Sequence, residues 1–189
     1  RGSVSLGLLA SRISAEGPTG FGSWMLAFRR STLEPALAVL RSTTDNVPDK
    51  FYFYDINGKL NFDATENDRL SLAFYTGTDN VLFPFGEDAS IGLNYGNRTI
   101  SGQWREILSD KLFLKTTATG SRYFNNPQFN IGGTPFERDN NVYDISLKSD
   151  LEYIPNERHT ISTGFWAGNL TLSFNDSFDN QETFKNRIR

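Results

Sequence analysis

The strongest structural signal lies in residues 51–63, which read Phe51-Tyr52-Phe53-Tyr54-Asp55-Ile56-Asn57-Gly58-Lys59-Leu60-Asn61-Phe62-Asp63. The even positions carry mostly aromatic and aliphatic side chains, and from Asp55 onward the odd positions carry charged or amide side chains. Side chains of a β-strand point alternately to the two faces of a sheet, so this period of two predicts a strand with one apolar and one polar face. The stretch is longer than the roughly five or six residues usual in soluble proteins, and long enough for the about nine to eleven that a tilted strand needs to cross a bilayer.

The same alternation recurs along the chain and predicts an all-β protein of about eight strands in four hairpins. Short links are expected near residues 16–22, 64–68, 108–110 and 155–159, and long links near 31–50, 77–94, 124–141 and from 169 onward. This alternation of link lengths is typical of outer-membrane barrels, whose periplasmic turns are short and whose extracellular loops are long. The other expected strands lie near residues 3–14, 23–30, 69–75, 95–107, 111–123, 142–153 and 160–168.

The composition supports strands with unlike faces and excludes several functions. Aromatic residues are 14% of the 189 residues, while apolar residues are only 38%. The net charge of −3 attracts no nucleic acid, and the absence of cysteine removes disulfides, thiol catalysis and cysteine metal sites. No signal peptide and no run of about 18 apolar residues occurs, which argues against a helical membrane protein but not against a barrel.

No residue is predicted to be catalytic, to bind a cofactor or to bind a metal, and no substrate-binding residue can be assigned. His159 is the only histidine, so a solvated turn residue is favoured over a metal ligand. Glu87, Asp88, Asp139 and Asp144 lack the spacing of a calcium loop, and solvated loop positions are expected for them. No Ser, His and Asp set is spaced as in a hydrolase, so we expect no enzyme and no cofactor.

Two further features fit a barrel. Residues 32–41 predict a short helix capped by Thr32, which packs on neighbouring segments or, as the less favoured alternative, lies near a substrate entrance. Trp24, Trp104 and Trp166 fit aromatic girdles at the two membrane interfaces, and cross-strand packing is nearly as good an explanation for each of them.

Several motifs, in order, resemble the N-terminal part of the barrel of TonB-dependent outer-membrane transporters of the type common in Bacteroidetes-like bacteria. Gly22-Ser23-Trp24-Met25-Leu26-Ala27-Phe28-Arg29-Arg30-Ser31 is similar to the second barrel strand of that family. The stretches at 51–61 and 67–77 resemble the next two strands. The order continues through Gly96-Asn97-Arg98-Thr99, residues 109–113, Ser121-Arg122-Tyr123 and His159-Thr160-Ile161.

The resemblance implies an antiparallel transmembrane β-barrel of about twenty-two strands around a plug, of which residues 1–189 are a part that lacks the plug and the remaining strands. It also implies import of an iron chelate, a vitamin or a saccharide across the outer membrane of a Gram-negative bacterium. The expected partners are outer-membrane lipids, the remainder of the barrel with its plug, and a TonB-type energising complex, but no nucleic acid. Because the chain begins at Arg1 rather than Met, a piece of a longer protein is expected.

Two alternatives remain open at this point. One is a complete small outer-membrane barrel of about eight strands with a structural or adhesive role, since that number can close around a filled interior. The other is a soluble β-rich binding module, which should have shorter strands and unsorted loops.

Overall fold

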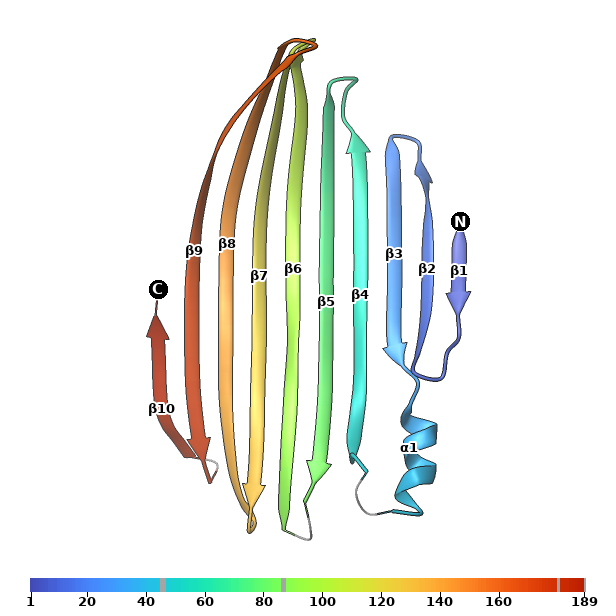
Figure 1. The fold of residues 1–189 in the computed structure, drawn as a ribbon, viewed down its shortest axis with the longest axis vertical. Helices are drawn as coiled ribbons and strands as arrows, with labels where there is room; N and C mark the ends of the chain where they lie inside the picture. Colours follow the sequence, from blue (N-terminus) through green and yellow to red (C-terminus); the bar gives the residue numbers. More distant parts are fainter. Residues whose placement is uncertain (45–46, 86–87, 180, 189) are drawn as a thin grey trace.

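The structure, a computed structural model, describes residues 1–44, 47–85, 88–179 and 181–188. They form one open antiparallel sheet of ten strands, ordered across the sheet as they are along the chain (Figure 1). The expected all-β fold is confirmed. The elements are β1 (Gly2–Ser5), β2 (Ala10–Thr19), β3 (Gly22–Ser31), α1 (Glu34–Arg41), β4 (Lys50–Asp63), β5 (Asp68–Pro84), β6 (Ala89–Ser109), β7 (Leu112–Ile131), β8 (Thr134–Asn156), β9 (His159–Phe178) and β10 (Gln181–Ile188).

The predicted count of about eight strands is wrong, first because residues 3–14 form two strands instead of one. The chain reverses between β1 and β2, so that Val4 pairs with Ile13. The hydroxyl of Thr32 holds this turn by donating to the Gly7 carbonyl oxygen at 2.6 Å. Apolar residues at Val4, Leu6 and Leu8 continue the period of two through the turn, and alternation alone cannot show a reversal there.

Three of the four predicted long links are also wrong. β5 and β6 extend through most of residues 77–94, β7 and β8 through most of 124–141, and β9 and β10 occupy most of the chain after 169. The β7–β8 connection is the turn at Gly132 and Gly133, whose φ angles of 60° and 80° suit glycine. These segments are rich in Asn, Gly and Asp, and cross-strand pairing has overridden their low strand propensity.

The fourth long link, which contains the expected helix, is confirmed. α1 begins at Glu34 with Pro35 in its first turn, and Glu34 forms an ion pair of 2.6 Å with Arg41. The predicted Thr32 cap is wrong, because Leu33 is the N-cap and no side chain caps the helix. None of the helix residues is buried. Within the described chain, no helix is long and apolar enough to span a membrane.

The sheet is a single layer of very long strands with almost no core. β8 contains 23 residues and β6 contains 21. At about 3.3 Å per residue, β8 is about 75 Å long, roughly twice what a tilted strand needs to cross a bilayer. In the described ranges, the only buried apolar side chains are Ala27, Val47 and Phe124. A layer of this kind needs lipid or further protein to cover its apolar side chains.

Candidate functional site

The candidate site is the sheet itself, whose two faces differ in chemistry. Residues directly opposite one another on paired strands share a face, so the register assigns every strand residue to a face. We name the faces after two residues of β3, the Trp24 face and the Arg29 face. The row Phe28, Ile56, Thr76, Arg98, Arg122 and Tyr143 crosses β3 to β8 on the Trp24 face, and we call it the Arg98 row. The turn half lies between this row and the short turns, and the far half lies beyond it.

The Trp24 face of the turn half is an apolar surface, which we call the apolar band. Its charged residues lie only at its borders, Arg98 and Arg122 at one and Asp68 and Glu106 near the short turns. It is strongly exposed, with Leu72 at 50% and Ile145 at 71% of full exposure. On β8 the band lies between Tyr143 and Tyr153, a path of about 33 Å along the strand. The large apolar members on β3 to β8 are Trp24, Leu26, Phe28, Ile56, Leu60, Phe62, Leu70, Leu72, Phe74, Ile100, Trp104, Leu114, Ile145, Leu147 and Leu151.

The Arg29 face of the turn half is charged and hydrogen-bonded across strands. Arg69 of β5 pairs with Asp63 of β4 at 2.5 Å, and Lys148 pairs with Asp150 along β8 at 3.0 Å. These pairs are largely exposed, so each contributes little stability. Their presence on a face directly behind the apolar band shows that the two sides of the sheet meet different surroundings.

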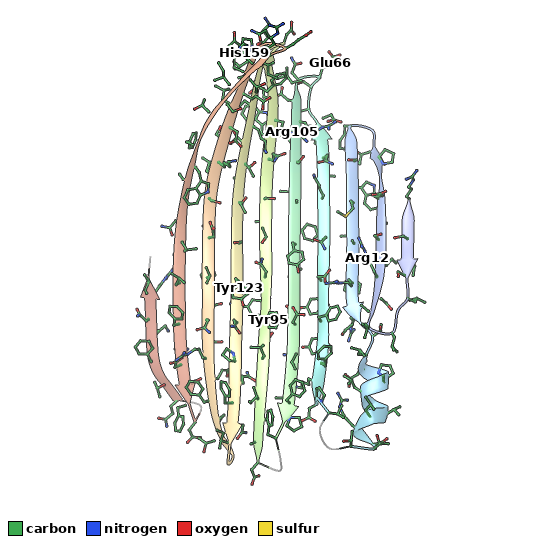
Figure 2. All side chains as sticks on the ribbon, viewed as in Figure 1. Arg12, Glu66, Tyr95, Arg105, Tyr123 and His159 are labelled. Atoms are coloured by element: carbon green, nitrogen blue, oxygen red, sulfur yellow. The ribbon has the colours of Figure 1, made fainter. Side chains whose placement is uncertain are left out.

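A hollow of about 1000 Å³ lies on the Arg29 face close to the short turns. Asp63 at the end of β4 and Ser162 and Gly164 of β9 line the same hollow. In a flat sheet β4 and β9 would lie about 24 Å apart, so the sheet curls toward the Arg29 face at this end. The polar face is therefore the concave one, and the apolar band lies on the outside of the curve. Figure 2 labels Arg105 and Glu66, two lining residues, at this end of the molecule.

In the far half the two faces exchange character. The Trp24 face becomes polar, with Asn80, Asn94, Asn126, Asp139 and Asn175 in one cross-strand row. The exceptions are few and include Leu82 and the buried Phe124. The Arg29 face becomes mainly aromatic and aliphatic, although the ion pairs Arg29–Asp55 and Arg138–Asp176 also lie on it. Its large apolar residues are Phe51, Phe53, Val81, Phe83, Ile91, Leu93, Tyr95, Tyr123, Phe129, Phe136, Val142, Leu172, Phe174 and Phe178. Tyr95 and Tyr123 are labelled in this half in Figure 2.

The exchange was not predicted, although a signal for it exists in the sequence. On β6 the large apolar residues stand at odd positions from Ile91 to Tyr95 and at even positions from Ile100 to Trp104. On β9 Phe165 and Ala167 stand at odd positions, whereas Leu170, Leu172 and Phe174 stand at even ones. A shift of phase inside one strand moves the apolar side chains to the other face, so it could have located the exchange.

The residues singled out from the sequence do not gather into one site. His159 begins β9 with Nδ1 2.9 Å from Oδ1 of Asn156. Glu87 lies outside the described residues, and Asp88 directly precedes β6. The expected loop positions of Asp139 and Asp144 are wrong, since both belong to β8, where their register places them on opposite faces. No metal-binding group of three acidic or histidine side chains occurs in the part of the chain that the structure describes.

The tryptophans divide between the two faces. Trp24 and Trp104 belong to the apolar band near the short turns, which fits an interfacial girdle. Trp166 lies on the Arg29 face opposite Lys148 and is 64% exposed, so it does not share a face with Trp24 and Trp104. The indole Nε1 of Trp104 donates to Oδ1 of Asp68 at 2.9 Å. This hydrogen bond links the apolar band to the first residue after the β4–β5 turn.

This contact makes Trp104 a reporter of the Asp68 charge. The Thr65 hydroxyl and then the Trp104 indole donate to Asp68 and lower the pKa of its carboxyl below the ordinary 3.8. The ionised form is therefore favoured in the folded protein, and the stability it contributes is present above pH 3.8 and lost as pH falls through the lowered pKa. In a W24F/W166F variant, Trp104 emission should change as Asp68 is protonated, with a midpoint below pH 3.8. D68N should remove the step, and a midpoint at or above 3.8 would contradict the contact.

No protein-family model matches the chain, and no curated protein and no solved structure is significantly similar to it. The function must therefore be argued from the two faces of the sheet.

Proposed function

We propose that these residues form part of the wall of an outer-membrane β-barrel, with the Trp24 face of the turn half toward lipid and the Arg29 face toward a wet lumen. The apolar band carries this proposal. Its charged residues stand only at its borders, and it lies outside a curve whose inside is charged. With the strand tilt of such barrels, about 40°, its length of about 33 Å on β8 would give the height of about 25 Å expected for their lipid-facing belt. A soluble sheet would have no reason to confine such a surface to half the length of its strands.

The exchange of character at the Arg98 row supports the same orientation. Beyond that row the Trp24 face carries asparagines and acids, which suit water and not hydrocarbon. The far half therefore stands outside the bilayer, and the short turns lie on the opposite, periplasmic side. This orientation is consistent with the resemblance of the chain to TonB-dependent transporters.

The two edges of the sheet favour a larger barrel over a small closed one. β1 and β10 each pair with one neighbour and not with each other. Backbone groups at a sheet edge cannot stay unpaired in lipid, so further strands of a parent protein would continue the wall at both sides. As part of such a transporter, the wall would enclose a plug and a path for an iron chelate, a vitamin or a saccharide, with an inner-membrane TonB-type complex as the energy source.

Labelling of single cysteines tests the wall directly, because the chain has no cysteine of its own. In native outer membranes, L72C should resist a water-soluble maleimide and react with a lipid-soluble one. S101C, which faces the opposite side at the same depth, and N94C in the far half should both react with the water-soluble reagent. Equal reaction of L72C and S101C with the water-soluble reagent would rule out the membrane wall.

The transport role needs a separate measurement. The intact protein that contains these peptides should be several times heavier than 21.3 kDa on a denaturing gel of the outer-membrane fraction. Its deletion should abolish growth on one limiting iron chelate, vitamin or saccharide, and a protonophore should abolish the same uptake in the parent strain. A membrane protein of about 21.3 kDa would instead favour a small structural or adhesive barrel.

A further inference from the structure

The border of the apolar band carries two arginines, of which Arg122 acts electrostatically on the Asp139 carboxylate without forming an ion pair with it. Arg98 of β6 and Arg122 of β7 lie directly opposite each other on the Trp24 face. Like charges in this position repel and destabilise a sheet. Neither arginine belongs to the ion pairs formed within the described ranges. An anion bound between these two cations, at the edge of the apolar band, would reduce their mutual repulsion.

The two guanidinium groups are held in place by neutral side chains. Arg122 donates from Nε and Nη2 to Oδ1 of Asn141, at 3.0 and 2.7 Å. Its guanidinium carbon lies 5.7 Å from the centre of the Phe124 ring, and that of Arg98 lies 5.8 Å from the same ring. The ring sits over Gly96, where a side chain would collide with it. A buried ring thus positions both cations while leaving donor groups of each available.

A groove of about 390 Å³ lies on the apolar band and extends across β4 to β7. Gly102, Trp104 and Ala118 are among the residues that line it. A side chain at Gly102 would meet nothing within 4 Å. From Arg98 to Gly102 the strand rises about 13 Å. The groove therefore lies on the short-turn side of the arginines, with Ile100 between Arg98 and Gly102.

We infer that Arg98 and Arg122 bind the phosphate of a phosphorylated lipid in the outer leaflet, one of whose acyl chains lies in the groove over Gly102. The inference rests on the proposed membrane wall and adds a specific lipid site to it. The two planar guanidinium groups can each offer paired N–H donors to phosphate oxygens, and the phosphate relieves their mutual repulsion. The apolar groove lies about 13 Å from the arginines, on the side toward which the acyl chains of such a lipid extend.

The test is lipid retention by the intact membrane protein. Wild-type protein in phosphatidylcholine nanodiscs is titrated with lipid A, and the bound lipid is counted by native mass spectrometry. R98Q/R122Q should bind lipid A at least ~10-fold more weakly, since loss of charge-assisted hydrogen bonds of this kind costs about 1.5–3 kcal/mol each. R105Q, on the opposite face of β6, is the matched control and should bind as the wild type does.

Further measurements distinguish a lipid site from binding of phosphate alone. G102V fills the groove without a collision and should weaken lipid A binding while both arginines remain, and dephosphorylated lipid A should bind the wild type weakly. Unchanged binding in R98Q/R122Q, or inorganic phosphate that binds as tightly as lipid A, would overturn the lipid site. If the variants embed in membranes but bind alike, only this inference fails, whereas a wild-type protein that never embeds overturns the membrane wall itself.

Discussion

Leu72→Arg is expected to destabilise the membrane-embedded protein by about 2–4 kcal/mol, the cost of an arginine at the bilayer midplane on the lipid face of a barrel. Leu72 lies on β5 midway between Asp68 and Thr76, which mark the two borders of the apolar band on that strand. Because the Leu72 side chain is 50% exposed, its replacement leaves no internal cavity, so a cavity does not explain the expected loss of stability. The penalty comes from placing a guanidinium in hydrocarbon.

The matched control is S101R, at the same depth on β6 but on the Arg29 face. There an arginine would stand in the wet lumen, and a change below about 1 kcal/mol is expected for an exposed polar position. Both variants would be unfolded with guanidinium chloride from lipid vesicles while tryptophan emission is recorded. If L72R loses no more stability than S101R, the Trp24 face does not meet lipid.

Where the alternation keeps one phase, the sequence predicts strands and faces well. Residues 51–63 lie within β4, and the apolar and polar positions assigned there fall on opposite faces of the sheet. The same holds for the part of β8 from Tyr143 to Tyr153. In these segments every second side chain meets the same surroundings, so the local sequence is sufficient to predict the strand and its two faces.

The strands of the far half could not be predicted from alternation, because the surroundings of each face change along a strand. Asn94, Asn125 and Asn126 are typical of loops, yet each lies in a ladder of paired strands. Strand pairing satisfies their backbone groups, and long-range partners are invisible in a local window. The lipid-binding arginines were missed for a related reason, since only the register of β6 and β7 brings Arg98 opposite Arg122.

The second large effect is expected at Gly96, where Gly96→Val should destabilise the protein by about 3 kcal/mol, the upper part of the range for overpacked sites. A Cβ atom at Gly96 would collide with the backbone oxygen of Gly77 and with the ring of Phe124. Backbone cannot rotate away as a side chain can, so β5 and β6 would have to separate locally. The ring would also leave its place between Arg98 and Arg122.

Gly102→Val supplies the control on the same strand and the same face. Its Cβ would enter open space, so the variant should be neutral or gain up to about 1 kcal/mol from the loss of glycine's freedom in the unfolded chain. The two unfolding midpoints in vesicles should therefore differ widely, although the substitution is the same. Equal midpoints would show that β5 and β6 do not approach each other closely at Gly96. The Phe124 ring would then not be held where it positions the two arginines.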